Sequence, residues 1–113
     1  MPVRIGFAQQ RRQLLEAELA RVTSEIGNYG IERAFLTGDF ALGKVMPSTE
    51  LELVIVQRTD CAFVERSDFF SSHLSQRIGM HTYVYTPDEF EQCAQSNPVI
   101  RRALSIGEEI FSV

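Results

Sequence analysis

The sequence lacks tryptophan, has only two cysteines and carries no excess of basic residues. Cys61 and Cys93 lie far apart and fit no metal-ligand spacing, which favours reduced thiols over a disulfide framework. Eleven Lys and Arg residues face 15 Asp and Glu, so the net charge is −4 and the pI is near 5.1. Proteins that bind nucleic acid non-specifically neutralise its phosphates with basic residues. We therefore expect no nucleic-acid partner.

Long apolar runs are also absent, and none approaches the roughly 18 residues that span a bilayer. Residues 1–13 contain no apolar signal region, because arginine and glutamine interrupt them. These features predict a cytoplasmic protein without a membrane partner. Two arginine pairs, Arg11-Arg12 and Arg101-Arg102, are typical of solvated helix faces. With 113 residues and 44% hydrophobic content, the chain is expected to form one domain over residues 1–113.

The hydrophobic pattern predicts helices that alternate with strands. An apolar stripe (Leu15, Leu19, Val22, Ile26 and Tyr29) predicts a first helix over about 7–29, with Arg12, Glu16, Glu18, Arg21 and Glu25 on its opposite side. Of the two neighbouring phenylalanines Phe69 and Phe70, only one can face the core of a helix, so the other is expected at the surface. Strands are predicted over 31–37, 50–57 and 80–85, and helices over 60–77, 87–95 and 97–104, followed by a short strand at 110–111. Thr86-Pro87-Asp88-Glu89 has the form of a helix capping box. This order indicates an α/β fold with a small mixed sheet flanked by helices.

Two neighbouring segments carry the residues with chemical potential. Gly38 and Gly43 bracket a turn at the end of one predicted strand, where backbone N–H groups can bind an anion. Glu50 and Glu52 open the next strand and, two residues apart, point to one face about 6.5 Å from each other along the strand. Such a pair can bind magnesium, which takes oxygen ligands. Ordinary turn glycines and a solvent-facing strand edge would produce the same residues.

Together and in this order, the two segments resemble the minimal nucleotidyltransferase domains of the DNA polymerase β-like superfamily. The first segment, Gly38-Asp39-Phe40-Ala41-Leu42-Gly43, is similar to that family's glycine turn, and Glu50-Leu51-Glu52 to its two metal-binding carboxylates. The strand at 80–85, the Tyr-Thr-Pro-acidic-Glu-Phe run after it and the tail at 97–107 extend the similarity over residues 30–111. The resemblance implies a nucleotidyltransferase-like fold and a site built at these positions.

The resemblance also implies roles for individual residues. Glu50 and Glu52 would hold Mg²⁺ and, with His81 in place of the family's third carboxylate, would form the catalytic set. A nucleotide would be bound by Gly38, Asp39, Gly43 and Lys44. An ordinary strand histidine would also explain His81.

The same positions depart from the family pattern. Asp39 stands where the family has a phosphate-binding serine, and an ionised carboxylate cannot donate a hydrogen bond. Leu42 replaces an arginine, and the glutamates exceed aspartate by a methylene that displaces their oxygens by up to about 1.5 Å. The site motifs are thus degenerate.

Three functions remain open at this point. The first is a catalytically degenerate domain that acts by binding, paired with a helical protein partner in a toxin–antitoxin-like arrangement or with a second copy as a homodimer. The second is an active, metal-dependent transferase that moves a nucleoside monophosphate onto a hydroxyl. The third is a small α/β dimerisation or sensing module whose likeness is only architectural.

Overall fold

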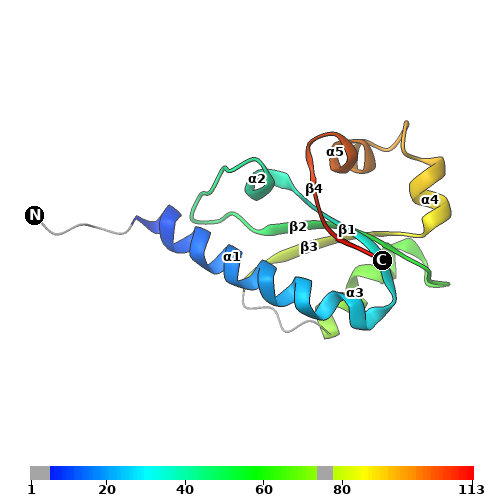
Figure 1. The fold of residues 1–113 in the computed structure, drawn as a ribbon, viewed down its shortest axis with the longest axis horizontal. Helices are drawn as coiled ribbons and strands as arrows, with labels where there is room; N and C mark the ends of the chain where they lie inside the picture. The colour runs from blue at the N-terminus through cyan, green and yellow to red at the C-terminus, as the bar shows by residue number, and fades with distance from the viewer. Residues whose placement is uncertain (1–5, 74–77) are drawn as a thin grey trace, which may run out of the picture.

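A computed structural model describes residues 6–73 and 78–113 as a four-stranded sheet with helices on both faces (Figure 1). The α/β class and the mixed sheet predicted from the sequence are confirmed. No helix of the described ranges is long and apolar enough to span a bilayer. In chain order the elements are α1 (Phe7–Ile26), the 3-10 helix η1 (Gly27–Tyr29), β1 (Ile31–Thr37), α2 (Gly38–Ala41), β2 (Leu51–Gln57), α3 (Phe63–His73), β3 (Met80–Tyr85), α4 (Pro87–Gln92), α5 (Pro98–Ile106) and β4 (Glu108–Ser112).

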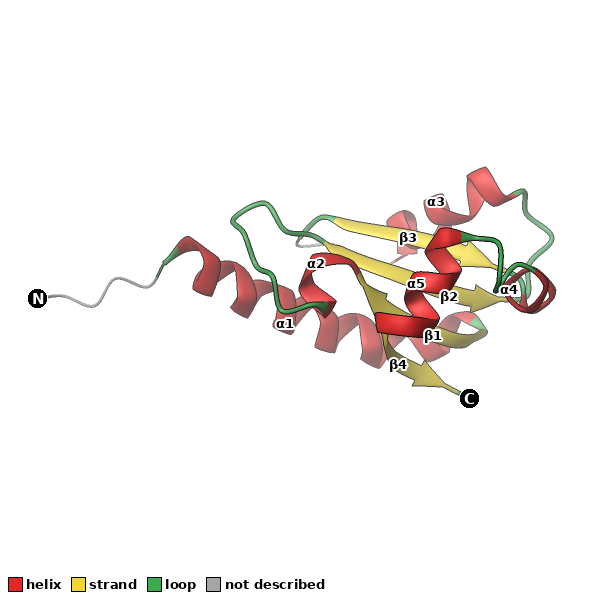
Figure 2. Cartoon of the chain, turned by 90° about the horizontal axis from the view of Figure 1, so that it is seen from above, coloured by secondary structure: helices red, strands yellow, loops and turns green. Residues whose placement is uncertain are grey.

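The strands are ordered β3-β2-β1-β4, so β2 and β1 lie at the centre (Figure 2). β2 runs parallel to β3 and antiparallel to β1, and β4 is antiparallel to β1. In this register Glu52 on β2 lies beside Thr37 on β1 and beside His81 on β3. The pairing therefore brings segments far apart in sequence together around Glu52.

Helices α1 and α3 cover one face of the sheet, while α4 and α5 lie on the other (Figure 1). The alternation along β2 assigns its side chains to the two faces: Leu51, Leu53 and Ile55 pack with α1 and α3. Val54 and Val56 pack in the second core, beneath α4 and α5. β2 is thus buried on both sides, as its apolar run predicted.

Most predicted elements are found near their predicted bounds. β1 and β3 span the predicted residues, β2 starts at Leu51 rather than at residue 50, and α1 ends at Ile26 with η1 after it. The part of the second predicted helix over 74–77 lies outside the described residues. The prediction that Glu18 lies opposite the apolar stripe of α1 is wrong, because Glu18 is only 3% exposed. Its carboxylate pairs with Arg21 and accepts a hydrogen bond from the backbone N–H of Ile78, which holds a carboxylate inside the α1 packing face.

Glu89 links three elements at the edge of the sheet. Its backbone N–H and its carboxylate complete the predicted capping box with Thr86, at the start of α4. The same carboxylate pairs with Arg66 of α3, whose Nη1 also donates to the backbone oxygen of Val84 on β3. The Arg66 side chain is 8% exposed, so it needs these acceptors in place of water. The Arg66 guanidinium is the main reason that the pKa of Glu89 is lowered from 4.5.

We expect Glu89→Ala to lower the free energy of unfolding by about 1–2 kcal/mol, because the cap and the acceptor for Arg66 are both lost. Glu89→Gln should cost less, since the amide can still cap the helix. The lowered pKa of Glu89 means that its charge stabilises the fold above pH 4.5, and that this contribution disappears as the pH falls through the folded-state value.

Urea denaturation of wild type and Glu89→Gln between neutral and acid pH measures this directly. The difference between them should shrink below pH 4.5, with Glu91→Gln, an exposed change on the same helix, as the control. A difference that stays constant into acid would contradict the pairing with Arg66.

Candidate functional site

Two neighbouring clefts open on the α5 face of the sheet, where β1 ends in α2 and β2 begins. The first cleft, of about 260 Å³, is lined by Asp39, Met46, Ser48, Thr49, Glu50, Glu52 and His81. The second cleft, of about 250 Å³, is lined by Thr37, Gly38, Asp39, Glu52, Tyr83, Val99 and Arg102. Because Asp39 and Glu52 line both, these two carboxylates separate the clefts.

Strand alternation explains which side chains reach the clefts. Glu52 lies on the same face of β2 as Val54 and Val56, and on β3 His81 and Tyr83 share that face. α4 and α5 cover the valines, whereas Glu52 lies past the covered part and lines the open clefts. The face thus changes from apolar to polar along one strand.

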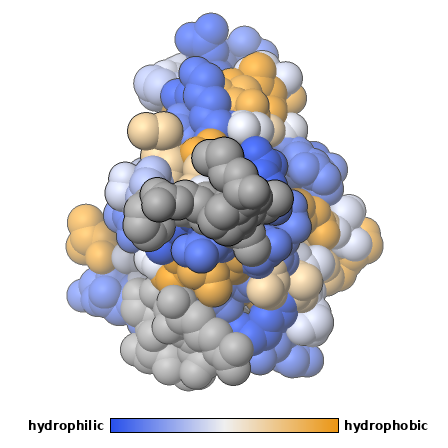
Figure 3. Space-filling view, turned by 90° about the vertical axis from the view of Figure 1, so that its left-hand side faces the viewer, coloured by the Kyte–Doolittle hydropathy of each residue, from blue (hydrophilic) through white to orange (hydrophobic). Residues whose placement is uncertain are grey.

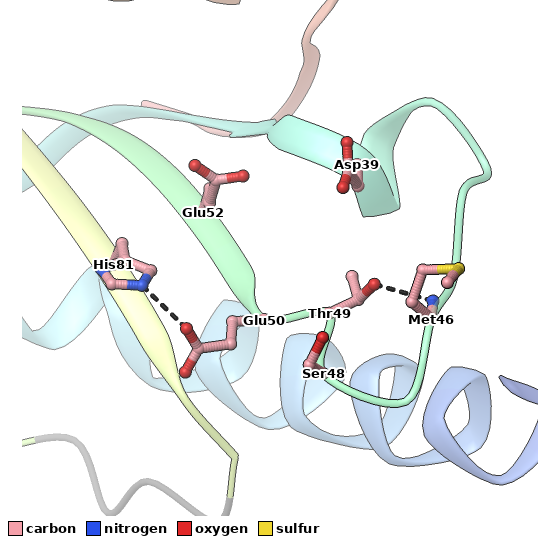
Figure 4. Close-up of a pocket in the computed structure, with 7 residues that line it drawn as sticks. All are labelled: Asp39, Met46, Ser48, Thr49, Glu50, Glu52 and His81. Carbon is pink, nitrogen blue, oxygen red and sulfur yellow. Dashed lines mark hydrogen bonds and ion pairs between the residues drawn. The ribbon is translucent and has the colours of Figure 1, made fainter. Parts of the chain in front are cut away.

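Glu50 pairs with His81 in the wall of the first cleft. Its Oε1 lies 2.9 Å from Nε2 of His81, and Figure 4 shows the carboxylate turned toward the histidine and away from Glu52 and Asp39. Gly79 makes room for this position, since a Cβ added there would overlap the Glu50 carboxylate. Both side chains of the pair are partly exposed, at 41% and 58%, so the contact alone contributes at most about 1 kcal/mol.

Glu52 lies against the turn that the sequence marks as an anion site. Gly38 has φ +79°, and a Cβ added to it would overlap Oε2 of Glu52. At the other end of the turn, Gly43 has φ +77° but no heavy atom within 4 Å of a Cβ position. The carboxylate of Glu52 therefore occupies the space that the glycine at position 38 leaves free.

The three carboxylates do not converge. Asp39 comes from the first turn of α2, Glu52 from β2 and Glu50 from the residue before β2, around the opening of the first cleft (Figure 4). Within residues 6–73 and 78–113, no group of three or more His, Cys, Asp or Glu side chains is placed to hold a metal ion. The magnesium site predicted at Glu50 and Glu52 needs only two carboxylates, with water as the remaining ligands, and it stays a prediction.

Only part of the predicted nucleotide-binding set lines the clefts. Gly38 and Asp39 line them, whereas Gly43 and Lys44 line neither. The cation that does line the second cleft is Arg102 of α5. Sequence reasoning placed Arg102 on a solvated helix face; its place beside the cleft depends on how α5 crosses the sheet. Strand alternation from His81 could have identified Tyr83, whereas Thr37, Met46, Ser48, Thr49 and Val99 carried no separate signal.

No protein-family model matches the chain, and no curated protein matches it. Among solved structures, a provisionally assigned nucleotidyltransferase from Sulfolobus solfataricus is similar, with a TM-score of 0.59 and 12% identity over 79% of this chain and 82% of that one. A chain of a mutant of the toxin–antitoxin complex MntA-HpeT gives a TM-score of 0.47 and 11% identity over 87% and 73%, too low a score for inference. The first similarity confirms the nucleotidyltransferase-like fold; at this identity it does not extend to activity.

The position of Glu52 predicts how two alanine substitutions will differ. Gly43→Ala should cost about 1–2 kcal/mol, the strain of a non-glycine residue at positive φ. Gly38→Ala carries the same strain and must also displace the Glu52 carboxylate, so it should cost more.

A double-mutant cycle by urea denaturation isolates the second part. In a Glu52→Ala background, the cost of Gly38→Ala should fall to that of Gly43→Ala. A cost that does not depend on residue 52 would show that the carboxylate is not held against Gly38 in solution.

Proposed function

We propose that this chain is a nucleotidyltransferase-like domain that no longer transfers nucleotides and acts by binding another protein. The observation that carries the proposal is the carboxylate of Glu52 lying against Gly38, in the turn that would otherwise receive a phosphate. The group that lies against Gly38 has the same sign of charge as the expected ligand.

Electrostatics supports this reading. Asp39, Glu50 and Glu52 all line the first cleft, where the facing basic group is His81, already engaged by Glu50. Two like charges about 4 Å apart repel by roughly 1 kcal/mol in bulk water and roughly 4 kcal/mol near a protein surface. Repulsion from even one carboxylate would therefore weaken triphosphate binding by up to about a thousandfold.

An active transferase is the second candidate, and one contact favours it. Glu50 could orient His81 as a general base, as carboxylates orient histidines in many acid–base sites. Arg102 would supply positive charge beside Gly38. In that case the glutamates would have to leave Gly38 and His81 and converge on magnesium.

Support for a protein partner comes from large apolar side chains at the surface. Phe70 is fully buried while Phe69 is 38% exposed, which confirms that only one of the two faces the core. Val64 on the same helix is 81% exposed, and Leu104 on α5 is 46% exposed. Phe69 and Val64 lie on α3 and Leu104 on α5, on opposite faces of the sheet, so they offer two separate apolar sites. A helical protein or a second copy of the chain would cover them.

Calorimetry with ATP, GTP, CTP and UTP, each with Mg²⁺ or Mn²⁺, tests the proposal. We expect no binding in the micromolar range, because the turn and the cleft present carboxylates to the phosphates. Micromolar binding that requires the metal would contradict the proposal that the domain is inactive and would favour an active transferase.

A gain-of-binding variant gives a sharper test. Asp39→Ser removes one carboxylate and adds a donor, and Glu52→Asp shortens the side chain so that it withdraws from Gly38. The double variant should bind triphosphates measurably more tightly than wild type, while Glu16→Asp on the exposed side of α1 should not. If the double variant binds no better, Glu52 and Asp39 are not what excludes the nucleotide.

A further inference from the structure

We infer that Arg11 of α1 is a positioning residue for the first cleft, although it lies far from it in sequence. Its Nε donates a 2.7 Å hydrogen bond to the backbone oxygen of Thr49, 38 residues along the chain, at a partly buried position. Thr49 is itself buried, with 8% exposure, and lines the first cleft. The bond therefore joins the first turns of α1 directly to the cleft wall.

The accepting oxygen matters because of the peptide to which it belongs. The carbonyl of Thr49 and the N–H of Glu50 form one planar peptide group. A guanidinium that fixes this oxygen also fixes the plane from which the Glu50 backbone departs. Arg11 thus sets the direction in which Glu50 leaves the loop to reach His81.

On the far side of Glu50 the chain is held by the backbone N–H of Leu51, which donates to the backbone oxygen of Gly79. Arg11 fixes the near side. The internal bonds of the loop before β2 run from Thr49 N–H to the Met46 oxygen and from Met46 N–H to the Thr49 hydroxyl, which shape the turn but do not anchor it. At its other end, Arg12 donates a longer 3.3 Å bond to the oxygen of Gly43. Val45 packs against the α1 and α3 core. Neighbouring arginines of α1 therefore hold both ends of the loop.

Figure 3 faces the end of the molecule at which α1 begins, and on the surface visible there around the grey atoms hydrophobic and hydrophilic areas alternate. A contact that moves the first turns of α1 would act on Thr49 and Glu50 through Arg11. The inference rests on the proposed function only in taking the first cleft as the functional site.

Amide hydrogen exchange by NMR on the free 113-residue chain tests the role of Arg11. In Arg11→Ala, the hydrogen-bonded amides of Thr49 and Leu51 should exchange at least about tenfold faster, the effect of losing a charge-assisted bond. The amides of Phe35 and Val54, in the sheet core, should be unchanged. Gln10→Ala, an exposed change in the same turn, is the matched control.

A second readout separates positioning from general stability. The side-chain ¹⁵N and ¹H shifts of His81 should move in Arg11→Ala, because Glu50 is released, and should return toward wild type in Arg11→Lys, which keeps a cationic donor. Unchanged exchange at Thr49 and Leu51, or unchanged His81 shifts, would overturn the inference. If Arg11→Ala does not fold, Arg11→Lys and Arg11→Gln are compared by the same measurements, with the larger change expected for glutamine. None of these measurements involves a nucleotide. A negative result would therefore not contradict the proposed function, and nucleotide binding by the wild type would not support a role for Arg11.

Discussion

The contact between the Glu52 carboxylate and Gly38 is the constraint on which the site depends. Position 38 has positive φ and no side chain, and β2 pairs with β1 so that residue 52 lies beside residue 37. A side chain one methylene longer than aspartate then reaches back over the glycine. In the folded chain the Glu52 carboxylate lies against the glycine turn that the sequence suggested as a phosphate site. Gly79 and Glu50 repeat the same arrangement on the neighbouring strand.

The positions of Glu50 and Glu52 bear on how the nucleotidyltransferase-like scaffold and the proposed loss of activity could occur together. The sheet order, the parallel β2–β3 pair and the turn at Gly38 are all consistent with the nucleotidyltransferase-like fold. The carboxylates, however, are held apart: one lies on Gly38 and the other is engaged by His81. A fold supplies positions for functional groups, and the side chains at those positions decide the chemistry.

The sequence could predict elements whose signals are local. The strands at 31–37 and 80–85 and the capping box at Thr86 follow from apolar runs and from cap residues close to one another in sequence. The sequence could not predict the contacts of Glu18 and Arg11 on α1. Their hydrogen-bond partners, the backbone N–H of Ile78 and the backbone oxygen of Thr49, come from distant segments. The position of Arg102 beside the second cleft could not be predicted either, because most of the other residues that line this cleft come from distant segments. Gly38 and Glu52 were both identified from sequence, but only the strand register shows that one fills the space of the other.

The most direct measurement is a crystal structure of the chain grown with a non-hydrolysable ATP analogue and Mn²⁺, with anomalous data collected at the manganese edge. We predict no anomalous peak between Glu50 and Glu52, with Glu52 lying on Gly38 and Glu50 paired with His81. A manganese ion bound by both glutamates, with the triphosphate on the turn from Gly38 to Gly43, would contradict the account and identify an active transferase site.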